Sequence, residues 1–206
     1  MAYSDFTLER VVNEFDLEVR RSALFPEVTP LALSHWLEQT LALTRQFVSA
    51  TASEKARSEF VVMPLLVEIV NRNPGQMAIY SGKNLEVDRD RGLTGECDFI
   101  LALGEMVDII VRPICCIVEA KKQDLEAGTG QCAAQMVAAQ QFNQRRHPDL
   151  TTIFGCVTTG EMWQFLQLRD RNFQIDNRLY FINEIPLILG CLQTILDFYQ
   201  PSLIPT

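Results

Sequence analysis

Apolar side chains recur at helical spacing over the first third of the chain. Residues 29–47 and 53–72 both show this spacing, and Thr29 followed by Pro30 is a suitable cap and first residue for the earlier helix. Pro64 interrupts the second stretch and is expected to kink it or divide it in two. This part of the chain is therefore predicted to be mainly helical.

Beyond these helices, short apolar runs bounded by glycine, proline and polar residues predict strands. Residues 76–88 are expected to form two short strands joined by a hairpin turn at 81–84. One helix is predicted to start near Gly128, and another covers 184–199 and stops before Pro201. The remaining strands are predicted at 95–103, at 113–121, at 177–182 and, as a pair joined by a turn at 158–160, within 150–168.

The order of these elements indicates one α/β domain with a central mixed sheet flanked by helices. No internal repeat or Ser/Gly-rich linker divides the 206 residues. We expect residues 1–50 to form an N-terminal helical extension, although 6–25 fit either an amphipathic helix or a strand followed by a helix. Residues 53–170 would form the main body, which the helix over 184–199 closes.

The composition is typical of a soluble globular protein, with 48% hydrophobic and 21% charged residues. No apolar run approaches the roughly 20 residues that a membrane span requires, and the first residues lack the basic and apolar regions of a secretory signal. The six cysteines form no C-x-x-C pair, which favours buried thiols over disulfides or a metal site. We therefore expect a cytoplasmic protein that does not act at membranes.

Charged residues near the ends of two predicted strands are the main candidates for chemistry. Alternation places Glu119 and Lys121 on one face of their strand, and Glu96 and Asp98 on one face of the preceding strand. If the strands are neighbours, Asp98 and Glu119 meet across the ladder, where two carboxylates repel each other unless a cation lies between them. Such oxygen ligands suit Mg²⁺, and a nearby lysine could orient water or stabilise charge on phosphorus.

The same residues also have simpler explanations. Glu119 and Lys121 could form a partly buried ion pair that has no catalytic role. Gln131 and Gln135 are four residues apart and therefore share one face of a helix. That face could be an ordinary polar surface, or it could hold a phosphate or an attacking water.

The series of motifs resembles the PD-(D/E)XK phosphodiesterase superfamily, the restriction-endonuclease-like nucleases. In that family an acidic residue on a first helix precedes an Asp on a strand, a Glu-x-Lys on the next strand and a Gln on the following helix. VEAKK and the glutamine-bearing stretch after it look most like the N-terminal nuclease region of type I restriction subunits, and like uncharacterised proteins related to them. The matching positions are, in order, Glu59, Asp98, Glu119, Lys121, and Gln131 or Gln135.

The resemblance implies a restriction-endonuclease-like fold and a role for each matching residue. Asp98 and Glu119 would bind Mg²⁺, or Mn²⁺ in its place, with Glu59 as an outer or additional ligand and Glu68 as its rival on the same helical stretch. Lys121 would help to activate water or stabilise the transition state, and one of the two glutamines would position the substrate. The candidate catalytic residues are thus Asp98, Glu119, Lys121, Gln131 and Gln135.

The implied function is that of a Mg²⁺-dependent nuclease whose partner is nucleic acid, with DNA as the first candidate. The similarity covers roughly residues 53–170 and departs from the family at Cys97, where most members have Pro. The net charge of -8 argues against this function, because proteins that bind nucleic acid are usually basic.

The alternative function is that of a non-catalytic member of the same fold, acting as an interaction or assembly subunit. The sequence leaves the oligomeric state open, with a homodimer among the options. A basic groove around Asp98 and Glu119 would favour the nuclease, whereas an acidic or closed pocket would favour the assembly role.

Overall fold

The computed structural model describes residues 1–48 and 53–203 and has an α/β fold built on one open, mixed sheet of eight strands. The strand order is β1-β7-β6-β5-β4-β3-β2, and β8 pairs with β6 beside this path. The pairs β1–β7 and β4–β5 are parallel, and the other pairs are antiparallel. The strands are β1 Glu18–Ser22, β2 Met77–Asp88, β3 Leu93–Leu103, β4 Ile114–Ala120, β5 Thr152–Thr158, β6 Met162–Arg169, β7 Asn172–Asp176 and β8 Tyr180–Phe181.

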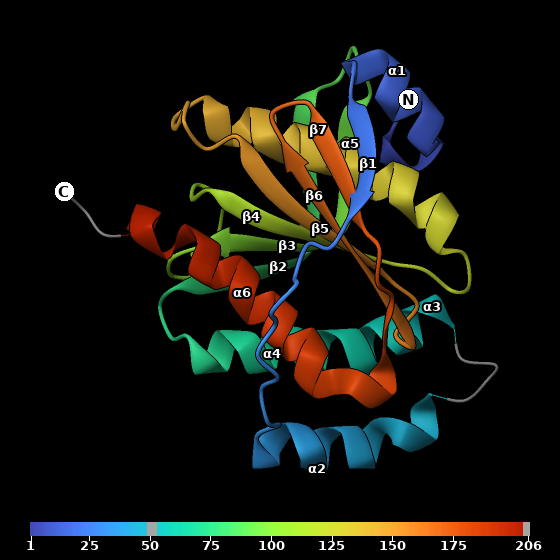
Figure 1. Ribbon diagram of the computed structural model, residues 1–206, viewed down its shortest axis with the longest axis vertical. Helices are drawn as coiled ribbons and strands as arrows, with labels where there is room; N and C mark the ends of the chain where they lie inside the picture. The colour runs from blue at the N-terminus through green and yellow to red at the C-terminus, as the bar shows by residue number, and fades with distance from the viewer. Residues whose placement is uncertain (49–52, 204–206) are drawn as a thin grey trace.

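Helices cover both faces of the sheet (Figure 1). On one face α5 packs against β4 and β5, and α1 lies on α5; on the other face α4 and α6 pack against the sheet and α2 packs on α4. Each face has its own group of buried apolar side chains. The predicted α/β class with a central mixed sheet is thereby confirmed. The helices are α1 Leu8–Phe15, α2 His35–Thr44, α3 Glu54–Arg57, α4 Met63–Arg72, α5 Leu125–Gln144 and α6 Ile185–Leu203.

The antiparallel pair β3 and β4 carries the candidate chemistry. Phe99 faces Val118 across the ladder, so one step further along both strands Asp98 comes opposite Glu119. Ile117, two residues before Glu119, belongs to the buried group under α5. Because side chains alternate between the two faces of a strand, Glu119 points toward α5 as well.

β2 is one continuous strand, so the predicted hairpin at 81–84 is wrong. Gly82 has a φ of 61°, a left-handed conformation that glycine adopts without a steric penalty. The ladder between β2 and β3 keeps its register from Ser81 to Lys83, on both sides of this glycine. The residues that suggested a turn therefore form a local irregularity inside a long strand.

Side-chain caps place the helix starts differently from the prediction. The start predicted at Thr29 and Pro30 is wrong, because α2 begins after Ser34, whose hydroxyl accepts the N–H of Leu37. Similarly, α5 begins at Leu125 rather than near Gly128, because the Asp124 carboxylate accepts two N–H groups of the first turn.

The C-terminal helix extends beyond the predicted stop. α6 continues through Pro201 to Leu203, because a proline close to a helix end removes only one backbone hydrogen bond while its φ suits the helix. No helix among the described residues, α6 included, is long and apolar enough to span a membrane.

Residues 1–48 contribute more than the expected helical extension. They form α1, which ends at Asp16 in a left-handed conformation, and then β1, which adds a parallel edge strand beside β7. Of the two alternatives considered for 6–25, the amphipathic helix is found over Leu8–Phe15, whereas a strand followed by a helix is wrong, since the strand comes after the helix. β7 was not predicted, and the strand expected at 177–182 is reduced to the two residues of β8.

The predicted disturbance at Pro64 takes the form of a π-helical turn, η3, over Ser58–Val62. It joins α3 to α4 without a break. Because Pro64 has no N–H, the carbonyl of Phe60 lacks its usual helical partner. The hydroxyl of Thr44 in α2 donates to that carbonyl at 3.2 Å, which ties the irregular turn to α2.

All six cysteines are buried free thiols, as their apolar surroundings predict. Burial raises the pKa of the Cys115 and Cys191 thiols to about 12, so they stay protonated and unreactive at neutral pH. We expect unfolded protein to react with six equivalents of a thiol reagent in the absence of reductant, and native protein with few. Absorbance of the released chromophore measures both values, and fewer than six equivalents after unfolding would contradict the assignment of free thiols.

Candidate active site

Asp98 and Glu119 face each other at the end of β4, on adjacent strands. The Asp98 Oδ2 accepts a hydrogen bond of 2.8 Å from the backbone N–H of Ala120, the residue directly after Glu119. This bond holds the Asp98 carboxylate of β3 against Ala120, the last residue of β4. The structure thus brings together the two carboxylates that the motif series singles out.

Glu119 is held by the other predicted residues. It is 1% exposed, its Oε1 accepts from the Lys121 ammonium at 2.7 Å, and its Oε2 accepts from the Gln135 amide at 2.9 Å. The Lys121 ammonium also donates to the Gln131 Oε1 at 3.0 Å. Four of the five candidate catalytic side chains therefore form one continuous hydrogen-bonded group, and Asp98 lies beside it.

A glycine at the start of α5 makes room for this group. A Cβ at Gly128 would lie 2.5 Å from Val157 and 2.8 Å from the Lys121 side chain. These distances are too short for carbon atoms in contact, so a larger residue would displace either the helix or the lysine. The close approach of α5 to β4 and β5 places Gln131 and Gln135 within reach of the strand end.

Proton affinities in this group are strongly coupled. Burial raises the pKa of Glu119 to about 7, and the Asp98 charge adds to this effect against the lowering influence of Lys121 and Gln135. Burial also raises the pKa of Asp98, outweighing its hydrogen bond from Ala120. Burial lowers the pKa of Lys121, but the charge and hydrogen bond of Glu119, together with the charges of Glu54 and Asp98, outweigh this effect and raise it. The lysine therefore stays charged, while Glu119 is partly protonated near neutral pH.

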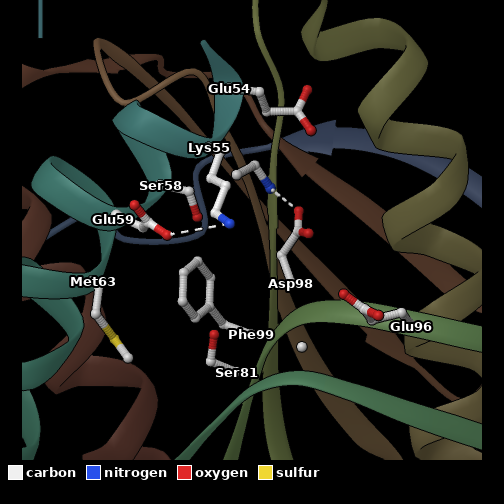
Figure 2. Close-up of a pocket in the computed structure, with 11 residues that line it drawn as sticks. Glu54, Lys55, Ser58, Glu59, Met63, Ser81, Glu96, Asp98 and Phe99 are labelled. Carbon is white, nitrogen blue, oxygen red and sulfur yellow. Dashed lines mark hydrogen bonds and ion pairs between the residues drawn. The ribbon is translucent and has the colours of Figure 1, made fainter. Parts of the chain in front are cut away.

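A pocket of about 400 Å³ opens beside Asp98, between the strands and the helical segment 54–63. Figure 2 shows Lys55 and Glu59 joined on the helical side of this pocket, with Asp98 and Glu96 on the strand side. Carboxylates outnumber cations in the lining: Glu54, Glu59, Glu96 and Asp98 face one lysine. The pocket is therefore acidic, which is the property expected of the assembly role rather than of a groove that binds phosphates directly.

Glu59 lines the pocket but is not part of the Asp98–Glu119 pair. Its side chain is 54% exposed and pairs with Lys55 at 3.8 Å. Glu54, in the first turn of α3, acts on the site instead: burial and then the charge of Glu54 raise the pKa of Asp98, against the hydrogen bond from Ala120. Glu54 was not predicted from the sequence, where its only signal is its position directly after the helix cap Ser53.

Glu68, the rival of Glu59, has a structural role. It is 2% exposed, and its carboxylate accepts from the backbone N–H and the hydroxyl of Ser34. Arg72, one turn further along α4, donates to the same carboxylate at 2.8 Å. Glu68 thereby fixes the start of α2 against α4, and it does not line the pocket beside Asp98.

The donor set at Asp98 and Glu119 fits a hard divalent cation bound by two carboxylates. Mg²⁺ commonly takes one or two carboxylates and completes its shell with waters and substrate phosphate oxygens. Among the described residues, no group of three or more His, Cys, Asp or Glu side chains is close enough to hold a metal ion, so two carboxylates are what the protein offers. Burial is the main cause of the raised pKa of both carboxyls, and the Asp98 charge adds to it at Glu119, an effect that a bound cation would offset.

A buried oxygen beside this pair also lacks a partner. Gln135 is fully buried and its amide nitrogen binds Glu119, but no described residue donates to its Oε1. A buried acceptor without a donor costs free energy, so a water is expected to complete this group.

Comparisons with family models and with curated proteins give no relative for this chain. No family model matches it, and no curated protein shows significant similarity to it. The function is therefore inferred from the geometry of the site together with the motif series.

Proposed function

We propose that this protein is a restriction-endonuclease-like, Mg²⁺-dependent phosphodiester hydrolase that acts on nucleic acid, with DNA as the first candidate substrate. One observation supports this most strongly: Asp98 and Glu119 face each other across adjacent strands, with Lys121 bonded directly to Glu119. A structural ion pair needs one acid and one base. It gives no reason for a second carboxylate that raises the pKa of the first.

Each residue of the group has a defined task in such a reaction. Asp98 and Glu119 would hold Mg²⁺, or Mn²⁺ in its place, and the bound ion would polarise a phosphoryl oxygen and acidify a water. The Lys121 ammonium offers a compact positive charge for the negative charge that develops on the phosphoryl group. Gln131 orients Lys121 and Gln135 orients Glu119, so the two glutamines position the reacting groups rather than touch the substrate.

The assembly subunit remains the second candidate, because the pocket beside Asp98 is acidic. Four carboxylates and one lysine repel a phosphate backbone until cations neutralise them. A nuclease built this way should bind nucleic acid only when divalent ions are present. An assembly subunit has no such requirement and would not cut in any ionic condition.

Cleavage of nucleic acid tests the proposal. We expect the wild-type protein to nick supercoiled plasmid or degrade single strands when Mg²⁺ or Mn²⁺ is added, and not when a chelator is present. Asp98→Asn should remove this activity, because an amide is a weaker ligand for a hard cation. Glu96→Gln is the matched control: Glu96 lines the same pocket but lies outside the bonded group, so its loss should leave cleavage within about threefold. Gel analysis of the products measures all three proteins.

A further inference from the structure

A second cavity lies beside the same helical segment that lines the pocket at Asp98. It has a volume of about 510 Å³, within the range of roughly 300–1,000 Å³ typical of small-molecule sites. The segment presents Glu54, Lys55, Ser58 and Glu59 to the first pocket, whereas other members of it face the second cavity. The apolar walls of this second cavity are Leu41, Val48, Phe60, Val61, Ile182 and Ile185.

A buried arginine lies in the lining of this apolar cavity. The Arg57 side chain is 9% exposed, and its Nη1 donates to two backbone carbonyls, those of Lys122 at 3.1 Å and Thr159 at 3.4 Å. The opposite edge of the guanidinium is not used in this way. Its Nε–H has no acceptor among the described residues, and Nη2 has only the Glu161 carboxylate at 3.8 Å, beyond hydrogen-bond distance.

An unused Nε–Nη2 edge is suited to a planar oxyanion. A guanidinium binds a carboxylate or phosphate through two parallel N–H bonds, and such charge-assisted bonds are about twice as strong as neutral ones. A buried donor without an acceptor costs free energy in the empty protein. An anion that takes this edge would recover that cost, while the two carbonyls continue to hold Nη1 in place.

We propose that this cavity, lined by Arg57 and six apolar side chains, binds a small organic anion that carries one carboxylate on an apolar body. The charges in the lining agree with this choice, because Arg45 and Arg57 outnumber Glu161 although the whole chain has a net charge of -8. The apolar walls would bury the body of the ligand, and Arg57 would bind its head group. This site is separate from the pocket at Asp98 and does not depend on the function proposed there.

Octanoate and the uncharged 1-octanol are suitable probes, because they share one apolar chain and differ in the head group. We expect calorimetry to show one octanoate bound per chain, and octanol to bind more weakly by about tenfold or by a larger factor. Binding should also change the emission of Trp163, whose indole N–H donates to the carbonyl of Gly160 in the cavity lining. Equal affinity for the two probes, or no saturable binding of octanoate, would overturn the proposal.

Three variants locate the binding site. Arg57→Lys keeps the charge but loses the two-donor edge, so octanoate should bind about tenfold more weakly. Glu161→Gln removes the carboxylate that competes for this edge and should strengthen binding about threefold. Because the Glu161 side chain is 61% exposed, this variant should fold. It therefore keeps the test decisive even if Arg57→Lys fails to fold. Arg112→Lys, in a different cavity, is the control. Unchanged octanoate affinity in every folded variant would contradict the site.

Discussion

Lys121→Ala is expected to reduce phosphodiester cleavage by about 10²–10³-fold while the protein still folds. The ammonium lies 2.7 Å from Glu119 and is the only described cation bonded to the candidate group. Its removal takes away the positive charge available to the transition state, but it leaves the strands and α5 in contact through Gln135 and Glu119. Single-turnover rates on a labelled oligonucleotide with Mn²⁺ measure the loss.

Two further variants separate a catalytic lysine from a structural one. Lys121→Arg should not restore the rate, because a planar guanidinium does not replace a compact ammonium between Glu119 and Gln131. Lys122→Ala is the matched control, since it removes the same charge from the adjacent, exposed position and should leave the rate within about threefold. Full activity of Lys121→Ala would show that this residue is only the partner of a buried carboxylate.

The stability of the metal-free protein is expected to fall as the pH rises through about 7, because of Glu119. Burial, aided by the Asp98 charge, raises the pKa of Glu119 from 4.5 to about 7 in the folded protein. A carboxyl whose folded pKa lies above its unfolded value favours folding in its protonated form. Its contribution is therefore fully present below pH 4.5 and is lost as the pH rises through about 7, an effect of about 3 kcal/mol in the free energy of unfolding.

Glu119→Gln isolates this contribution, since glutamine has the shape of the protonated acid and does not titrate. At pH 8 the variant should be more stable than the wild type by about 2–3 kcal/mol, and at pH 5 the two should differ by less than about 1 kcal/mol. Urea unfolding in a chelating buffer at both pH values gives the difference. A wild type that gains stability relative to the variant between pH 5 and pH 8 would mean that Glu119 is ionised in the folded protein and satisfied by Lys121 and Gln135.

The sheet around the site could be predicted because its signals are local. Residues 95–103 and 113–121 are apolar runs with clear ends, and side-chain alternation in each strand places Asp98 and Glu119 on one face once the strands pair. The motif series can also be read along the chain. Its members follow one another in the order Asp98, Glu119, Lys121 and the two glutamines, so the sequence alone identifies them. Their hydrogen bonds agree with that series.

Other features depend on contacts that the local sequence does not contain. Gly82 suggested a turn, but pairing with β3 on both sides keeps it within one strand. β1 belongs to the sheet only because it finds β7, about 150 residues away along the chain. Likewise, Glu59 and Glu54 are equivalent acids in sequence, and only the orientation of α3 shows that the charge of Glu54 acts on Asp98 while Glu59 pairs with Lys55.

Binding of Mn²⁺ tests most directly whether Asp98 and Glu119 form a divalent-cation site. Calorimetry of the wild type at pH 8 should show about one weakly bound ion per chain, with Mn²⁺ bound more tightly than Mg²⁺. The variant that combines Asp98→Ala with Glu119→Ala should lose this ion, Glu54→Ala should weaken its binding, and Glu59→Ala should have little effect because Glu59 pairs with Lys55. Equal Mn²⁺ uptake by the wild type and the double variant would contradict the metal site, and with it the proposed hydrolase.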